Sequence, residues 1–296
     1  MGCHIGPPPC ATVRLLPYLL ALALFPRDAL AWGLETHLFF AQWLLAALPF
    51  ADPELRGAAS RLPRFVLAGA CLPDLALSGK ALGLVAFRRA HEWSTLRRMT
   101  SAPRSDAHRA LAIGYASHLV SDVVAHNDFV PEHEARIARV RHVTHAIAEF
   151  AMDEHVRSSL ALSPSAALEA EPAELADFVA YAFRCSEPVA GRALAFLARA
   201  DRTLRASPLP RLCRRTVARF YRDPGYRFDG YVERVKRRLA EIELALAGQF
   251  SDWVSSDPEG RNGEQAGRAG DGAADERARR HIAWVMQAEN NPRDGG

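Results

Sequence analysis

The sequence predicts an all-α fold, because apolar residues recur at helical spacing and strand-like patterns are scarce. Ala, Leu and Arg dominate the interior segments, and alternating runs of Val, Ile and Thr are rare. Apolar residues make up 49% of the 296 residues and charged residues 24%, which suits a folded chain with a full core. The net charge of +3 comes without a long Lys/Arg block, so we expect no stable nucleic-acid partner.

Residues 1–31 have the pattern of an export signal. Arg14 supplies a positive flank, Leu15 to Phe25 are largely apolar, and Ala29-Leu30-Ala31 is a small-x-small cleavage site. The apolar run is shorter than the roughly 20 residues that a membrane span requires. We therefore expect cleavage before Trp32 and a periplasmic or secreted mature protein.

Each expected helix is justified by apolar spacing and by its boundary residues. Residues 34–49 are apolar almost all round and end at Pro49, and an apolar segment over 60–72 leads into a turn at Leu72-Pro73-Asp74. A helix is predicted over 107–126 with Asp106 as its N-cap. Pro131 is expected to open the next helix, which would run to about Val156.

The second half of the chain also reads as helical until its tail. Helical spacing is present in four further segments, over 171–184, 187–204, 208–222 and 228–249. Residues 255–275 are polar and Gly-rich, which predicts a disordered linker, and 276–287 could form one amphipathic helix. The predicted organisation is a signal peptide over 1–31, an all-helical domain over 32–254 and a flexible tail over 255–296.

The mature chain would keep three cysteines, Cys71, Cys185 and Cys213. An odd number leaves at least one free thiol, and Cys185 with Cys213 is the favoured pair if a disulfide forms. The fold is not expected to depend on disulfides.

One segment carries a stripe of metal-ligand residues. His118, Asp122 and His126 are four residues apart, so on a helix they lie along one face. The residues between them are mostly apolar, which places the stripe in or beside the core. A buried carboxylate is costly unless it is paired or bound to a metal, and imidazole with carboxylate suits zinc.

The following helix repeats the pattern. His145 and Glu149 are four residues apart, and Asp153 extends the same face by one turn as a candidate partner that fixes a ligand histidine. A single His-xxx-Asp pair is usually a local hydrogen bond, but two such helices joined by a short connection favour a metal site. The remaining histidines of this region are expected to face solvent, namely His108, His133, His142 and His155.

These motifs resemble the zinc-dependent phospholipase C and S1/P1 nuclease superfamily over roughly residues 32–160. The predicted mature start, Trp32-Gly33-Leu34-Glu35-Thr36-His37, looks like that of the nucleases. The block from His118 to His126 resembles the glycosylphosphatidylinositol-specific phospholipase D branch, with a shorter Asp122–His126 gap than in the secreted phospholipases C. The pair His145 and Glu149 is similar to the ligand ending of the bacterial phospholipases C.

The resemblance implies a multi-helix bundle with a trinuclear zinc site. One zinc would be held by Asp74, His91, His118 and Asp122; a second by the amino and carbonyl groups of Trp32, by His37 and by a bridging Asp122; and a third by His126, His145 and Glu149. An amine binds zinc only when it is free, so the unprocessed chain would lack a complete site. The Asp74–His91 gap is slightly longer than in the family.

The resemblance implies hydrolysis of phosphodiester bonds by metal-activated water, with Asp74 as the catalytic residue that orients or deprotonates the water. Phospholipid head-group hydrolysis of the phospholipase C type is the favoured activity, and peripheral membrane contact is a further expectation. An S1/P1-like single-strand nuclease is the alternative, and a non-catalytic exported zinc-binding protein is the third.

Overall fold

The computed structural model describes residues 33–137, 141–220 and 228–249, and these residues fold into packed helices without a β-strand. The signal-like leader, Trp32, the polar linker and the amphipathic tail segment lie outside the described residues. No described helix combines the length and the apolar composition required to cross a bilayer. The all-α prediction is confirmed.

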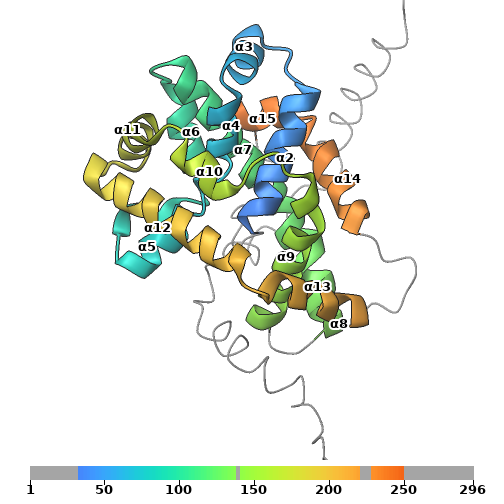
Figure 1. Ribbon diagram of the computed structural model, residues 1–296. Helices are drawn as coiled ribbons and strands as arrows, with labels where there is room; N and C mark the ends of the chain where they lie inside the picture. The colour runs from blue at the N-terminus through green and yellow to red at the C-terminus, as the bar shows by residue number, and fades with distance from the viewer. Residues whose placement is uncertain (1–32, 138–140, 221–227, 250–296) are drawn as a thin grey trace, which may run out of the picture.

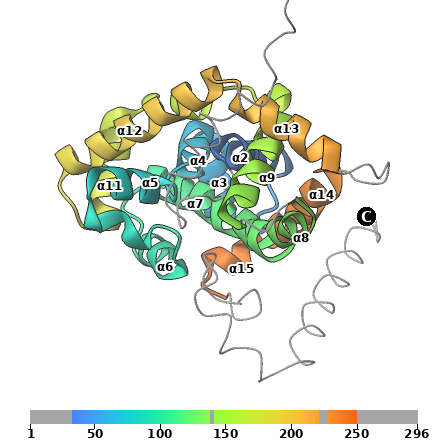
Figure 2. The same cartoon turned by 90° about the horizontal axis from the view of Figure 1, so that it is seen from below.

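The other helices surround a central helix, α7 (Figures 1 and 2). The helices of the first half are α2 (Leu34–Ala47), α3 (Pro53–Arg61), α4 (Pro63–Gly69), α5 (Leu75–Leu82), α6 (Trp93–Ser101), α7 (Asp106–Val124), α8 (Val130–Ile137) and α9 (Arg141–Val156). Those of the second half are α10 (Pro164–Glu169), α11 (Pro172–Phe183), α12 (Glu187–Ala206), α13 (Leu209–Phe220), α14 (Phe228–Leu239) and α15 (Ile242–Leu246).

Helix α7 is the centre of the core, and it is buried on nearly every side. It packs against α2, α3, α4, α6, α14 and α15. Two glycines allow its closest approach to α4. A Cβ on Gly114 would lie 1.9 Å from the carbonyl oxygen of Val66, and one on Gly69 would lie 2.2 Å from that of Leu111. The two backbones therefore touch at these glycines, which brings the end of α4 against the ligand-bearing half of α7.

Several predicted helix boundaries are corrected. Ser105 caps α7, because its hydroxyl accepts a hydrogen bond from the His108 amide, while Asp106 is the first helical residue and pairs with Arg61. The helix expected from Pro131 to Val156 is two helices, α8 and α9, which pack against each other. The segment over 228–249 is likewise divided between α14 and α15. Helices α3, α5 and α10 were not predicted, and α5 occupies a segment that was expected to be a Gly-containing loop.

The favoured Cys185–Cys213 disulfide is absent. Cys71, Cys185 and Cys213 are all free thiols. Cys185 follows α11, whereas Cys213 is buried on α13, which packs mainly against α9. The two thiols therefore belong to different layers of the helical body.

Candidate metal centre

Five ionisable side chains from four segments meet beside the C-terminal half of α7, and we call them the buried cluster. His37 comes from α2, Asp74 immediately precedes α5, His91 follows the 3₁₀ turn Val85–Arg89, and His118 and Asp122 lie on α7. All five are at most 8% exposed. Such burial of polar side chains is costly unless they are satisfied by one another or by a bound ion.

The distances within the buried cluster are short. His118 Nε2 lies 3.2 Å from both His91 Nε2 and Asp122 Oδ2. His37 Nε2 lies 3.3 Å from Asp122 Oδ1, and the His37 and His118 rings stack with centroids 3.4 Å apart. His91 Nε2 is 3.6 Å from Asp74 Oδ1. The ring nitrogens and carboxylates thus converge on a small volume.

Two overlapping sets of ligand atoms could each hold a metal ion. His37, His118 and Asp122 form one set, and Asp74, His91 and His118 form the other, with the ligand atoms of each set within 4.8 Å of one another. Imidazole nitrogens and carboxylate oxygens are the ligands that zinc accepts in proteins. Sequence reasoning named all five of these residues, and the fold brings them together.

Backbone and hydroxyl partners fix the imidazoles of His37 and His118. The Ala70 carbonyl oxygen can only accept, so the 2.8 Å contact to His118 Nδ1 places the ring proton on that nitrogen. Ser121 Oγ donates its proton to the His118 carbonyl oxygen. In its 2.9 Å contact with His37 Nδ1, Ser121 Oγ therefore accepts the hydrogen bond, and the ring proton lies on Nδ1. Both Nε2 lone pairs therefore face the buried cluster, as metal ligation requires.

Sequence reasoning missed this support. Ser121 and the Ala70 carbonyl carry no motif of their own. Only the position of Ser121 could have indicated its role, because it directly precedes Asp122 and lies three residues after His118 on the same helix. The close approach of α4 and α7, at Gly114 against Val66 and at Gly69 against Leu111, brings the Ala70 carbonyl within reach of His118.

The electrostatics of Asp122 support the fit to a cation. Both carboxylate oxygens are buried, and neither takes part in a well-formed hydrogen bond. Burial opposes ionisation of Asp122, but His118 and His37 beside it bring its pKa below the usual value. Burial, reinforced by His118, lowers the pKa of His37 to about 3. An ionised carboxylate beside the neutral imidazole of His37 is a donor pair suited to a divalent metal.

A second group lies where α7 ends, and we call it the π-turn group: His126, His145 and Glu149. The helix changes to a π-helical turn over Ala125–Phe129, so His126 departs from the regular four-residue stripe. His145 Nε2 is 2.6 Å from Glu149 Oε1, and the His126 and His145 ring centroids are 5.3 Å apart. The predicted neighbourhood is present, but these three residues do not form a compact ligand set like the other two.

The π-turn group also has shifted pKa values. Burial raises the pKa of Glu149 to about 7, although His145 favours its ionised form. Burial lowers the pKa of His126 to about 4, against the opposite pull of Asp122. The second carboxylate oxygen of Glu149 is buried without a hydrogen bond. A cation here would stabilise the ionised Glu149 carboxylate and use the neutral imidazole of His126.

Asp153 supports the start of α2. Its Oδ1 accepts hydrogen bonds from the Thr36 amide at 3.0 Å and the Thr36 hydroxyl at 2.6 Å, and these are its partners instead of a ligand imidazole. A Cβ on Gly33 would lie 1.8 Å from Asp153 Oδ2, so only glycine fits there. Asp153 therefore fixes the backbone that leads to His37. Trp32, the implied N-terminal ligand, lies outside the described residues.

Two of the histidines expected to face solvent are buried. His108 is 6% exposed and lies 3.5 Å from Asp177, where it contacts Phe178 and Tyr181. His133 is fully buried, and its Nδ1 contacts the Phe129 carbonyl oxygen at 2.6 Å. His155 is partly exposed and pairs with Asp229 at 2.9 Å. The side chain of His142 lies outside the described residues.

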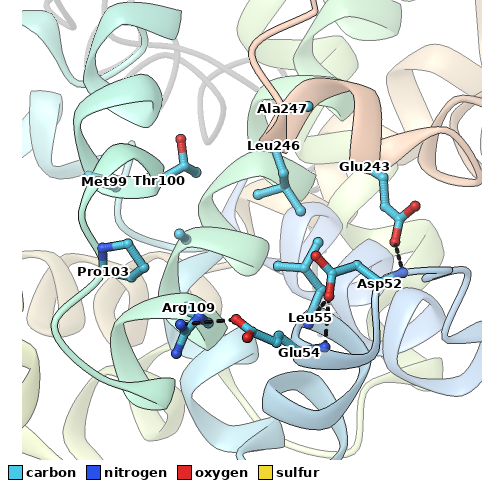
Figure 3. A pocket seen from close by; sticks show the side chains of 11 residues that line it. Asp52, Glu54, Leu55, Met99, Thr100, Pro103, Arg109, Glu243, Leu246 and Ala247 are labelled. Carbon is cyan, nitrogen blue, oxygen red and sulfur yellow. Dashed lines mark hydrogen bonds and ion pairs between the residues drawn. The ribbon is translucent and has the colours of Figure 1, made fainter.

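A hollow of about 420 Å³ lies elsewhere in the molecule, between α3, α6, α7 and α15. Figure 3 shows its mixed lining, in which the Arg109 guanidinium pairs with Glu54 at 3.1 Å and Leu246 contributes an apolar wall. No residue of the buried cluster or of the π-turn group lines it. The hollow is therefore separate from the candidate metal centre.

The described residues therefore define an all-α protein whose histidines and carboxylates converge beside α7 as a candidate metal site. A profile of the zinc dependent phospholipase C family matches residues 36–183, from α2 to the end of α11, which is half of the chain. The chain belongs to the zinc-dependent phospholipase C family. Neither a curated protein nor a solved structure matches it significantly.

Proposed function

We propose that the chain is an exported zinc-dependent hydrolase that cleaves phosphodiester bonds of phospholipids in the manner of a phospholipase C. The family match supports zinc and phospholipase C chemistry as a class. The observation that carries the proposal for this chain is the buried cluster, in which both ligand sets share His118 and converge around the Asp122 carboxylate. Export is supported by the leader-like pattern of residues 1–31.

In this proposal the zinc ligands are distributed over two places. The buried cluster would hold two ions, with Trp32 completing one of them after cleavage of the leader, and the π-turn group would hold a third. When bound, zinc acidifies water and offsets the negative charge that develops on a phosphoryl group. His37 and His118 present their Nε2 atoms because Ser121 and Ala70 hold the other nitrogen.

Asp74 is the proposed catalytic residue. It is 3% exposed, directly precedes α5, and its side chain does not cap that helix. Its carboxylate is therefore available to orient the attacking water and to accept a proton on an oxygen atom. His91 Nε2 lies beside that carboxylate, 3.6 Å from Asp74 Oδ1.

The test is turnover by the mature protein starting at Trp32, on phosphatidylcholine and on single-stranded DNA. Phosphatidylcholine should release its phosphorylated head group, and Asp74→Asn should abolish release while most zinc is retained. Asp177→Asn is the matched control, because Asp177 is 55% exposed and contacts His108 away from the cluster. Wild-type zinc content without head-group release would sink the proposal.

A nuclease is the second candidate. The spacing of Trp32 and His37 favours it, because that start resembles the S1/P1 nucleases. Cleavage of single-stranded DNA, lost in Asp74→Asn and with phosphatidylcholine left intact, would keep the metal centre and change the substrate class.

A further inference from the structure

The helices that follow the family match carry a concentrated positive charge. Residues 188–220 contain eight arginines, no lysine and a single acid, Asp201. The whole chain has a net charge of only +3, so the rest of the molecule is acidic on balance. This stretch forms the last nineteen residues of α12 and all of α13, and it lies beyond residue 183, where the family profile ends.

Most of these arginines project into solvent. Six of them are exposed: Arg192, Arg199 and Arg202 on α12, and Arg211, Arg215 and Arg219 on α13. On α13 the spacing is four residues twice, so the three guanidinium groups follow one stripe of the helix. The opposite side of α13 buries Leu209, Cys213 and Val217. We call the exposed side of the two helices the arginine face.

Among the described residues, carboxylates neutralise little of the arginine face, and the closest ion pair there joins Arg202 to Glu169 at 2.5 Å. In the described part of the chain, no carboxylate pairs with Arg192, Arg199, Arg215 or Arg219, whereas the one acid of the stretch, Asp201, is buried and pairs with Arg205 at 3.1 Å. Arg211 has only a 3.8 Å contact with Glu154. Unpaired exposed guanidinium groups on one surface produce a field that attracts anionic partners.

The arginine face lies on the outer side of elements that lead to the metal centre. Helices α12 and α13 follow one another along one edge of the body (Figure 2). Helix α12 packs against α5, which begins directly after Asp74, and α13 packs against α9, which carries His145 and Glu149. A surface bound to the arginine face would therefore be held against the part of the molecule that contains both ligand groups.

The chemistry of the face favours a membrane over a nucleic acid. The exposed residues between the arginines are small, such as Ala195, Ala200, Thr203 and Ala218. Single-stranded nucleic acids are bound by aromatic side chains on which bases stack, and no aromatic residue is exposed among the described side chains of α12 and α13. Binding to an anionic bilayer requires only basic side chains, and each basic residue near the bilayer surface contributes to the binding free energy.

We propose that the arginine face of α12 and α13 is the surface by which this protein docks on membranes that contain anionic phospholipids. The proposal rests on the proposed function, which it deepens by naming the surface that faces the substrate aggregate. The apolar side of α13 is packed on α9, so docking is electrostatic and does not insert the helix. Binding should therefore weaken as the salt concentration rises.

The experiment is vesicle co-sedimentation of the mature chain, with vesicles of phosphatidylcholine alone and vesicles that also contain phosphatidylglycerol. The triple variant Arg211→Gln, Arg215→Gln, Arg219→Gln should lose affinity for the anionic vesicles roughly 100-fold, from about a factor of five per basic residue at an anionic surface. The control is Arg61→Gln, Arg64→Gln, Arg97→Gln, which removes the same charge from exposed positions on α3, α4 and α6. The control should retain binding.

The outcomes separate docking from turnover. Equal binding to both vesicle types, or an equal loss in the control variant, would overturn the proposal. So would tighter binding to a single-stranded oligonucleotide, lost in the α13 variant, which would assign the face to nucleic acid. Hydrolysis of dispersed short-chain phosphatidylcholine should be unchanged in the α13 variant. Vesicle binding without any hydrolysis would leave the docking surface and remove the proposed function.

Discussion

The buried cluster and the π-turn group use the same residue types, but their surroundings differ. In the buried cluster, His118 and His37 are fully buried and each has its Nδ1 held by a group outside the cluster, the Ala70 carbonyl or the Ser121 hydroxyl. In the π-turn group, the side chain of His145 is 18% exposed and contacts Glu149, a member of the same group. A metal ion would replace internal contacts in both groups, such as His118–His91 and His145–Glu149, but in the first group partners outside it already orient the imidazoles.

The difference lies in how α7 ends. Through Asp122 the helix is regular, and it lies close against α4 where Gly114 meets Val66 and Gly69 meets Leu111. From Ala125 it continues as a π-helical turn, which displaces His126 from the stripe. Ligand spacing in the sequence is therefore not sufficient to predict an ordered metal site, because partners outside the ligand set decide which ligand side chains are held in place.

Asp122→Asn should give the largest effect. The Asp122 carboxylate contacts His37 and His118 and is the charged group between the two ligand sets, so its neutralisation should impair both. We expect hydrolysis to fall at least about 100-fold, which exceeds the effect of removing a partner of a ligand. We also expect the variant to lose most of the zinc of the buried cluster. Asp128→Asn, on the exposed side of the π-helical turn, is the control. Undiminished zinc in Asp122→Asn would show that the buried cluster is not the main site.

Ser121→Ala tests the preorganisation of the buried cluster directly. The variant removes the acceptor for His37 Nδ1 without touching a ligand, and zinc affinity measured by competition with a chelator should fall about 10- to 100-fold. Ser117→Ala is a matched control, because Ser117 is equally buried on α7 and bonds only to the Gly114 carbonyl. Equal zinc affinities of the two variants would show that the Ser121 hydroxyl does not orient His37 for metal binding.

Glu149→Gln tests the π-turn group through pH. In the metal-free protein, burial raises the pKa of Glu149 from 4.5 to about 7. The folded state therefore binds a proton that the unfolded state releases, and this contribution to stability is full below pH 4.5 and lost as the pH rises through about 7. The expected size is about 3 kcal/mol, at about 1.4 kcal/mol per pKa unit.

The measurement is the free energy of unfolding of the metal-free protein at several pH values. Glu149→Gln should lack the fall in stability between pH 4.5 and about 7 that the wild type shows. The same slope in both proteins would mean that Glu149 is ionised in the folded metal-free state. Zinc retained in the buried cluster of this variant would show that the buried cluster binds metal independently of the π-turn group.

Gly33→Ala should give the smallest of these effects on turnover. The added Cβ would meet Asp153 Oδ2 at 1.8 Å, so the backbone before His37 must shift. We expect about a 10-fold loss of hydrolysis, the lower end of the effect of disturbing a ligand's support. Gly191→Ala on α12 meets no atom within 4 Å and should raise stability by about 0.5 kcal/mol. A fully active Gly33→Ala variant would contradict the role of Asp153.

Much of the site was predictable from sequence because zinc ligands are recognisable by residue type and spacing. His118 and Asp122 share a helical face, and His145 and Glu149 form the predicted neighbouring pair. Helix type was also predictable, since α11, α12 and α13 follow the apolar spacing closely.

The parts that failed depend on long-range packing. The π-helical turn at His126, the division of α8 from α9 and the burial of His108 and His133 all depend on neighbours distant in sequence. The contact of Asp153 with Thr36 joins residues 117 positions apart, which local spacing cannot show.

The most direct test of the metal centre is the zinc content of the mature protein starting at Trp32, compared with a version that carries one additional N-terminal Met. We expect about three zinc ions per chain in the first, as the ligand set implies, and at least one fewer in the second, because an acylated nitrogen is no longer a free amine. Equal zinc in both would contradict the N-terminal ligand. A mature protein without zinc would contradict the metal centre itself.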